Sequence, residues 1–285
     1  MKMRDLKIVN KELIEKLDKL AIMVDKIFDN KDFLKKMYDD KTKHASPLER
    51  IKEGKEPLKV APHWFELPDD TRSNIKEGQY DPCGEAYLRF MQNLMIINNK
   101  SYAACGYPNK ETFFSGQMFY NDPKLLAELG IPEFKDAIYD ISSGFLGGQA
   151  MALCGFYTPD TYIPWHHNGN ASGFNILLHY NKEGDGSFYT YHDGEIIDYK
   201  DEPGWIARGG RFLDSLQYDS YAGKVVIDYK KESELNRKHR TTIDKATPET
   251  ASWHAAHARS NRFTLSTIVN DEFLWEDLMD EIEGH

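Results

Sequence analysis

Short runs rich in β-branched and aromatic residues, separated by Gly, Asp, Asn and Pro, dominate the chain from about residue 136 onward. Many short strands with regular turn signals are typical of an all-β sandwich or barrel. Asp193-Gly194 stands between two of these runs and predicts a hairpin turn. The strands expected from the pattern are residues 150–157, 174–180, 187–191, 195–199, 204–207, 224–229 and 262–269.

The part of the chain before these runs is expected to be largely helical. Apolar residues recur every three or four positions over residues 10–40, which predicts a helix docked on the body of the protein, with a dimerisation helix as the alternative. Residues 85–97 show the same spacing, and Pro123 is placed to begin a further helix that ends at Gly130. The fold class is therefore mainly β with flanking helices (α+β).

Composition narrows the class of protein. A net charge of −10 argues against a general nucleic-acid binder, which would show a basic footprint. No stretch approaches the roughly 18–20 apolar residues that cross a membrane, and the charged N-terminus lacks the apolar segment of a signal peptide. Cys83, Cys105 and Cys154 lie far apart without CxxC spacing, which predicts reduced thiols in a cytoplasmic protein.

Two Trp-His steps, Trp165-His166 and Trp253-His254, carry the candidate site. Neutral imidazoles are good ligands for iron, copper, nickel and zinc. Arg262 follows the second step, and its planar guanidinium suits a carboxylate. Two histidines on a metal beside an anchored carboxylate predict a non-haem iron site that holds a keto-acid cosubstrate.

The sequence around these residues resembles the Fe(II)/2-oxoglutarate-dependent oxygenase superfamily. The run YTPDTYIPWHHN, residues 157–168, resembles the strand that carries the first iron ligand. Residues 174–181 and the glycine-rich turn after them resemble the next strand of that superfamily. His254 and the Arg262-x-Thr264 pair match its distal histidine and its Arg-x-Ser/Thr motif.

This resemblance, over roughly residues 145–270, implies a fold and an activity. The fold is a double-stranded β-helix (jelly-roll, cupin-like) core within an oxygenase domain, residues 61–285, preceded by a helical N-terminal extension, residues 1–60. The activity is hydroxylation of an unactivated C–H bond of a small-molecule, amino-acid or peptide substrate, with O₂ consumed and succinate and CO₂ released. The residues implied are His166 and His254 for Fe(II), and Arg262, Thr264 and Tyr157 for 2-oxoglutarate.

Asn168 departs from the superfamily's pattern, in which an Asp or Glu stands two residues after the first histidine. Three readings remain open. Asn168 ligates iron weakly through its carbonyl oxygen, or lies beside a vacant or water-filled position, or leaves room for an external anion such as chloride. The last arrangement is that of the superfamily's halogenases, so a halogenase on the same fold is an alternative function. A non-enzymatic, cupin-like metal- or ligand-binding protein is the other.

The register of the metal ligands also has alternatives. His167 in place of His166 would give a His-x-Gly pattern closer to the halogenases, and His257 could replace His254. We prefer His166 because its register aligns with Tyr157 and the following strand. Neighbouring residues on a strand point to opposite faces, so only one of His166 and His167 is expected to bind the metal. The other histidines are interpreted as surface or packing residues: His44, His63, His179, His192 and His239.

Overall fold

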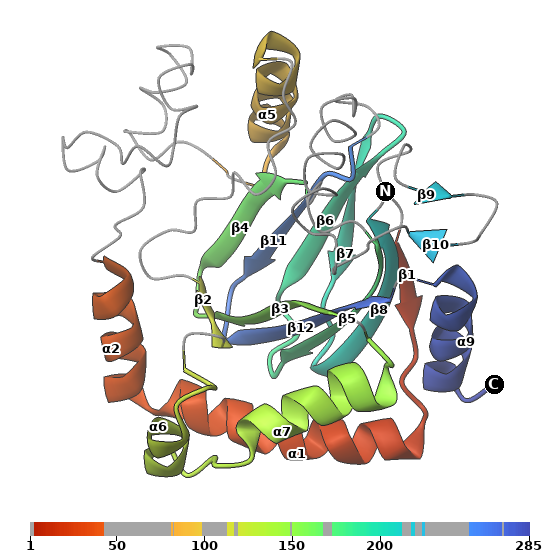
Figure 1. Cartoon of the computed structure of the whole chain (residues 1–285). Coiled ribbons are helices and arrows are strands. Elements are labelled where there is room, and N and C mark those ends of the chain that lie inside the picture. The colour runs from red at the N-terminus through yellow and green to blue at the C-terminus, as the bar shows by residue number, and fades with distance from the viewer. Residues whose placement is uncertain are drawn as a thin grey trace, which may run out of the picture.

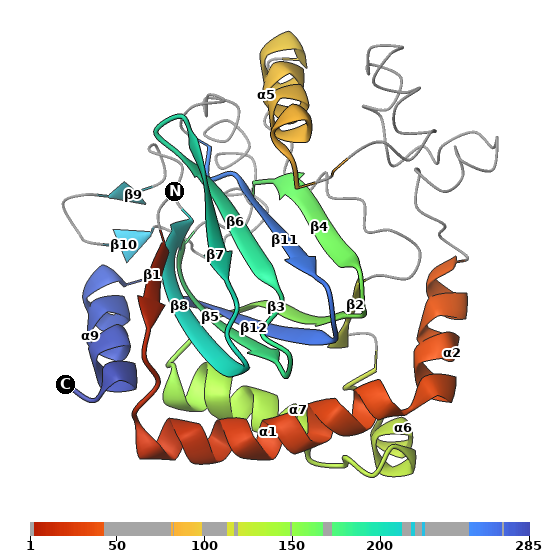
Figure 2. The same ribbon diagram turned by 180° about the vertical axis from the view of Figure 1, so that it is seen from behind.

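A computed structural model shows two antiparallel sheets with helices around them (Figure 1). The structure describes residues 3–42, 81, 83–98, 113–116, 119–148, 150–167, 173–212, 218–219, 224–225, 251–269 and 271–285. The larger sheet has the order β1-β8-β5-β12-β3-β2 and the smaller one the order β4-β11-β6-β7. Figure 2 shows from behind how the smaller sheet rises over one face of the larger.

The strands of the six-stranded sheet are β1 (Met3–Leu6), β8 (Gly204–Phe212), β5 (Gly173–Asn181), β12 (Arg262–Val269), β3 (Ala150–Tyr157) and β2 (Phe113–Ser115). Those of the four-stranded sheet are β4 (Thr161–His166), β11 (His254–Ala258), β6 (Ser187–His192) and β7 (Glu195–Lys200). A separate pair joins β9 (Tyr218–Asp219) to β10 (Lys224–Val225).

Most strands expected from the sequence pattern are confirmed. The run predicted over 224–229 forms a strand only at Lys224–Val225, and residues 226–229 lie outside the described part of the chain. The hairpin predicted at Asp193-Gly194 joins β6 to β7, with His192 opposite Glu195. Both turn residues have positive φ, 50° and 89°, as a two-residue type I′ turn requires.

The helix predicted over residues 10–40 is two helices, α1 (Lys11–Asp29) and α2 (Lys31–Thr42). Asn30 separates them, because its side-chain oxygen accepts from the backbone N–H of Phe33 and so begins a new helix. The helix expected at Pro123 is confirmed. The remaining described helices are α5 (Glu85–Asn98), α6 (Pro123–Glu128), α7 (Phe134–Tyr139), the π-helix η3 (Asp140–Phe145) and α9 (Glu272–Glu283).

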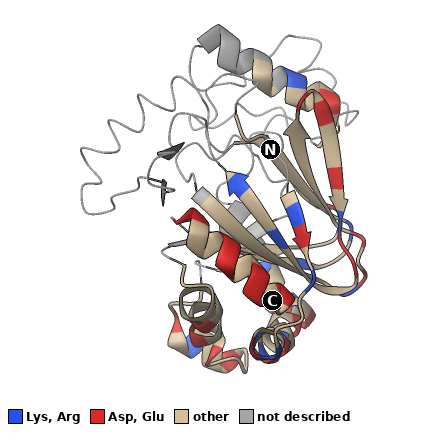
Figure 3. Cartoon of the chain, turned by 90° about the vertical axis from the view of Figure 1, so that its right-hand side faces the viewer, with Lys and Arg blue, Asp and Glu red and all other residues tan. Residues whose placement is uncertain are grey.

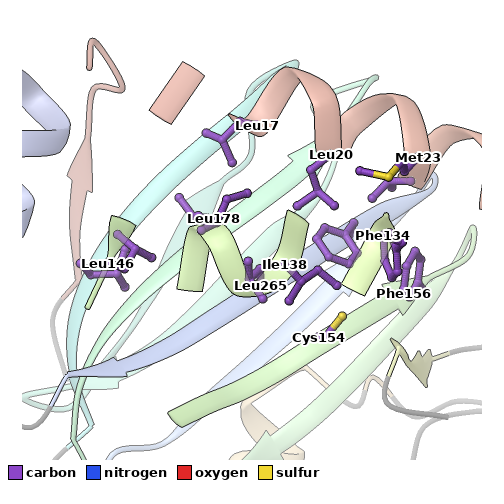
Figure 4. Packing of buried hydrophobic residues seen from close by; sticks show 14 of the residues in the cluster. Leu17, Leu20, Met23, Phe134, Ile138, Leu146, Cys154, Phe156, Leu178 and Leu265 are labelled. Atoms are coloured by element: carbon purple, nitrogen blue, oxygen red, sulfur yellow. The ribbon is translucent and has the colours of Figure 1, made fainter. Parts of the chain in front are cut away.

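The main apolar core lies between the six-stranded sheet and the helices α1 and α7 (Figure 4). Leu265 and Leu178 lie on the covered face of the sheet, on β12 and β5, and Leu20 of α1 belongs to the same cluster. Alternation along a strand puts every second residue on this face. Helix and sheet therefore share one core, to which the first described residues of the chain contribute.

The opposite face of the six-stranded sheet meets the four-stranded sheet. Tyr157 and Leu177 of the larger sheet share a small cluster with Phe188 and Ala256 of the smaller one. Alternation from Leu265 and Leu178 assigns Arg262, Thr264 and His179 to this inner face. A face between two sheets is usually apolar, so the polar side chains buried there make this face the candidate for a functional site.

Two further helices pack against the sheets, α5 on the four-stranded sheet and α9 in the main core beside α1 and α7. Trp165 and Trp253 form a cluster on the outer side of the four-stranded sheet with residues at the start of α5, and Trp165 Nε1 donates to the Cys83 carbonyl at 2.8 Å. The C-terminal helix α9 packs through Trp275, whose Nε1 donates to the Asn175 carbonyl, and its sequence contains no lysine or arginine (Figure 3). Among the described helices, none has the length and apolar character needed to span a membrane.

Candidate functional site

His166 and His254 lie directly opposite each other on the neighbouring strands β4 and β11. Their ring centroids are 4.2 Å apart with an interplanar angle of 56°. Regular alternation from Ile163, which is opposite Ala256, would put His166 on the other face of the sheet. The register shifts between Ala256 and His254, so β4 carries an extra residue there and His166 comes opposite His254.

His254 is held in a defined tautomer. Its Nδ1 lies 2.8 Å from the backbone carbonyl oxygen of Ser252, which can only accept, so Nδ1 carries the hydrogen. Burial, then the neighbouring His166, lowers the pKa of His254 well below its usual range, so the ring is neutral. The lone pair is consequently on Nε2. The rings of Phe188 and Phe212 contact this imidazole, with centroids 5.8 Å and 4.8 Å away.

His167 lies apart from this pair. Its ring packs edge-to-face against Trp253, 4.9 Å between centroids, and Trp253 belongs to the outer cluster of the four-stranded sheet. Neither ring nitrogen has a hydrogen-bond partner among the described residues. Burial, then the adjacent His166, lowers the pKa of His167 to about 4. The structure thus brings His166, and not His167, opposite His254.

The other metal-site candidates are less well placed. His257 is opposite Tyr162 on β4 and Ser187 on β6, one residue out of phase with Ala256, and so faces away from the inner side. Asn168 lies outside the residues that the structure describes. Within the described ranges, no group of three or more His, Cys, Asp and Glu side chains is arranged to hold a metal. Two imidazoles are therefore the protein ligands that this part of the chain offers.

Arg262 is fully buried and is already paired with a carboxylate of the protein. Its Nε donates to Asp201 Oδ2 at 2.6 Å, and Nη2 donates to Oδ1 at 3.5 Å. Its third contact runs from Nη1 to Thr264 Oγ1 at 3.0 Å, as expected for residues two apart on a strand. The edge of the guanidinium that includes Nε is thus used by Asp201, and Nη1 is turned toward Thr264.

Asp201 also binds a second buried arginine. Arg208 Nη1 donates to Asp201 Oδ1 at 2.8 Å, and Arg208 Nε donates to Asp5 Oδ1 at 2.8 Å. The two arginines and Asp201 have side chains that are at most 1% exposed, whereas the Asp5 side chain is 62% exposed. The fully buried charges therefore sum to one positive, and the arginines lower the pKa of Asp201 against the effect of burial.

A glycine makes this ion pair possible. A Cβ on Gly186 would lie 2.2 Å from Asp201 Oδ2 and 3.2 Å from Arg262 Cδ, so no other residue fits without displacing them. Gly186 ends the glycine-rich turn after β5, and its carbonyl accepts from the backbone N–H of Asp201 at 2.9 Å. The turn thus brings Asp201 to Arg262.

Tyr157 and His179 complete the polar inner face. Tyr157 is directly opposite Arg262, whose Cζ lies 5.2 Å from the ring centroid, and burial raises the pKa of this phenol. His179 is opposite Thr264, and its Nδ1 lies 3.0 Å from Thr264 Oγ1. The structure thus brings Tyr157, Arg262 and Thr264 together, as the sequence motif predicted.

Three members of this cluster were not anticipated from the sequence: Asp201, Arg208 and His179. His179 was interpreted as a surface or packing histidine; its exposure of 1% excludes the surface position, and its Nε2 has no partner among the described residues. A signal was present, since His179 follows the apolar run Ile176-Leu177-Leu178 and Arg208 comes directly after the predicted strand 204–207. Buried polar residues in such strands are informative because burial without partners is costly.

Comparisons with known proteins add little. No protein-family model matches the sequence, and no curated protein matches it either. Among solved structures, one similar chain is a prolyl-4-hydroxylase from Pseudomonas putida, with 12% sequence identity over 65% of this chain and 84% of that chain. The TM-score of 0.23 is too low to support an argument about fold or activity. The site therefore has to be interpreted from its own geometry.

Proposed function

We propose that this protein is a non-haem Fe(II)- and 2-oxoglutarate-dependent oxygenase that hydroxylates an unactivated C–H bond. The observation that carries the proposal is one buried inner face that presents both a pair of imidazoles, His166 and His254, and a positively charged anchor built on Arg262. A metal and an organic anion are the ligands that such groups bind.

The connectivity of the strands supports a double-stranded β-helix. From β3 to β12 the chain alternates between the sheets except at the β6–β7 hairpin, which stays in the smaller one. The strands β3, β5, β8 and β12 belong to the larger sheet, and β4, β6, β7 and β11 to the smaller. Two four-stranded layers wound in this way make a jelly roll with an interior between the layers. We propose that residues 150–269 form this core, with β1 and β2 added at its edges.

The two histidines fit a divalent metal ion. His254 is neutral, and its hydrogen bond to the Ser252 carbonyl puts the lone pair of the ring, through which an imidazole binds a metal, on Nε2. His166 is opposite on the neighbouring strand, so both rings reach the same point of the inner face. Phe188 and Phe212 pack around His254 and keep water away from it. These residues would hold iron from one side and leave other positions for the cosubstrate.

The arginine cluster fits the distal carboxylate of 2-oxoglutarate. Its buried side chains are two arginines and one aspartate, and the second carboxylate partner of Arg208, Asp5, is exposed, so an organic anion would find its complement beside Arg262. Arg262 Nη1, the Thr264 hydroxyl and the Tyr157 ring lie on the inner face where that carboxylate would bind. When bound, iron and the keto acid together supply the oxidising power for C–H hydroxylation, with succinate and CO₂ as co-products. The residues of this chain bind, orient and shield them.

Iron and 2-oxoglutarate binding test the proposal directly. Under anaerobic conditions, the wild-type protein should bind about one Fe(II) per chain and develop a visible charge-transfer absorption when 2-oxoglutarate is added, as bidentate keto-acid binding requires. Replacement of His166 or His254 by Ala should abolish both signals, because each removes one of two imidazole ligands. His192→Ala is the matched control, since His192 is exposed at the end of β6. Full iron occupancy in His254→Ala would refute the assignment.

A further inference from the structure

We propose that His179 is an additional carboxylate-binding residue, whose Nε2–H donates a hydrogen bond to the same carboxylate that Arg262 and Thr264 bind. The inference rests on the proposed function and extends it to a residue outside the sequence motif. It is carried by the position of His179, by the direction of its hydrogen bonds and by the charge of the groups around it.

His179 lies on the inner face of β5, between the arginine cluster and the histidine pair. Its Nδ1 is 3.0 Å from Thr264 Oγ1, and its ring centroid is 6.0 Å from that of Phe188. Phe188 in turn stacks on His254 at 5.8 Å. A single aromatic ring thus separates His179 from His254, so a ligand that extends from Arg262 toward the histidine pair would pass beside His179.

The proton of His179 is assigned from the chain of hydrogen bonds that reaches its ring. Thr264 Oγ1 accepts from Arg262 Nη1 at 3.0 Å and keeps one hydrogen and a second lone pair, so it can donate to His179 Nδ1 or accept from it. We assign Thr264 as the donor, because a hydroxyl that accepts from a guanidinium is polarised to donate, and the lone pair of Nδ1 then lies on the side of the cation. Nδ1 is then the acceptor, and the hydrogen of the neutral ring is on Nε2. Burial, then Arg262, lowers the pKa of His179 well below its usual range, which agrees with a neutral ring.

This arrangement leaves a buried donor that lacks an acceptor. Nε2 has no hydrogen-bond partner among the described residues although the side chain is buried. An unsatisfied buried donor destabilises a protein unless a bound molecule satisfies it. The neighbouring buried side chains are two arginines and one aspartate, and the Asp5 that also pairs with Arg208 is exposed, so an anion beside Arg262 is the complementary acceptor. A carboxylate has two oxygens and can accept from Arg262 and from His179 at once.

Two amide replacements of His179 distinguish the hydrogen bond at Nδ1 from the hydrogen bond at Nε2. In His179→Asn, the amide can occupy the Nδ1 position and keep the Thr264 contact, but the donor at the Nε2 position is lost. In His179→Gln, the longer side chain can place an amide N–H where Nε2–H was. We expect His179→Asn to weaken binding of succinate and of 2-oxoglutarate by about tenfold or more, as loss of a hydrogen bond to a charged group does, and His179→Gln to retain most of the affinity.

The experiment is calorimetric titration of the Mn(II)-loaded protein with succinate and with 2-oxoglutarate. Mn(II) occupancy should be unchanged in His179→Asn, a cooperative unfolding transition shows that the variant is folded, and His192→Asn is the matched histidine control. Equal carboxylate affinity in wild type and His179→Asn overturns the inference while the oxygenase proposal stands. If the wild type binds neither carboxylate, both proposals fail. If it binds succinate with this dependence on His179 but catalyses no turnover of 2-oxoglutarate with Fe(II), the inference holds and the oxygenase proposal fails.

Discussion

Arg262 and Asp201 form an ion pair in which neither side chain is exposed to solvent, with Nε 2.6 Å from Oδ2. Asp201 also pairs with Arg208, so one buried carboxylate serves two buried guanidinium groups. A pair of this kind costs desolvation on both sides and is weak support for stability alone. Its position on the inner face, beside Thr264, instead suggests that Asp201 holds Arg262 ready for a ligand.

Replacement of Asp201 by Asn should therefore destabilise the free protein and make it more dependent on anions. Removal of one partner of a buried ion pair typically costs about 3–5 kcal/mol, and here it leaves two buried arginines. Succinate should raise the unfolding midpoint of Asp201→Asn more than that of the wild type, because it supplies the missing negative charge. Thermal unfolding with and without succinate measures both effects.

Asp193→Asn provides the control for the loss of a carboxylate. The Asp193 side chain is 87% exposed in the β6–β7 turn, so its replacement should change stability by less than about 0.5 kcal/mol. An Asp201→Asn protein as stable as the wild type would show that the carboxylate does not balance the arginines.

The contrast between Arg262 and Asp201 also shows what could be predicted from the sequence. Arg262 stands two residues from Thr264 on one strand, so local spacing was enough to bring these two residues together. Asp201 is 61 residues away from Arg262, and Asp5 is 203 residues away from Arg208. Such partners depend on the order of strands in the sheets, which local periodicity does not encode.

The fold was predictable to a similar extent. Alternation and turn residues identified most strands and the β6–β7 hairpin, because these signals act over a few residues. The strand β1 was missed, since Met3–Leu6 is short and becomes a strand by pairing with β8 at the edge of the sheet. The bulge opposite His254 was also missed, because an extra residue in one strand is visible only against its partner.

Arg262→Lys should impair carboxylate binding although the positive charge remains. Lysine cannot reproduce the planar fork that contacts Asp201 and Thr264 together. Breaking a buried charge-paired contact costs about 2–5 kcal/mol of binding free energy, so the affinity for 2-oxoglutarate should decrease at least tenfold. Calorimetric titration of the metal-loaded protein gives this affinity.

Arg211→Lys is the matched control for that substitution. Arg211 lies on β8, is half exposed and pairs with Glu272 at the protein surface, so its replacement should leave carboxylate affinity unchanged. Unchanged affinity in Arg262→Lys as well would rule out the proposed anchor.

The buried His179 should make stability depend on pH. Its pKa in the folded protein is well below the usual 6.5, so below about pH 6.5 the unfolded chain takes up a proton that the folded chain does not. Above that pH the residue is neutral in both states and does not lower the free energy of unfolding; below it, the free energy of unfolding falls with the pH. The free energy of unfolding should thus decrease by up to about 1.4 kcal/mol per pH unit on account of this residue.

Urea unfolding of wild type, His179→Asn and His192→Asn at about pH 7, 6 and 5 measures this contribution. The decrease between about pH 6.5 and 5 should be smaller in His179→Asn than in the wild type, and unaltered in His192→Asn. Parallel curves for all three proteins would mean that His179 is protonated in the folded state.

The three readings of Asn168 predict different reactions at the proposed iron site, and its substitution by Asp distinguishes them. The added carboxylate would put a negative charge beside a divalent cation, and the attraction is stronger in a partly desolvated site than in water. If Asn168 is a weak ligand or lies beside the metal, Asn168→Asp should tighten Fe(II) binding and hydroxylation should persist. If an external anion such as chloride takes the position, the new carboxylate should exclude it, and any halogenated product should be replaced by a hydroxylated one. Product mass with and without chloride, for wild type and Asn168→Asp, separates these outcomes. Loss of iron binding in a folded Asn168→Asp protein would place residue 168 away from the metal.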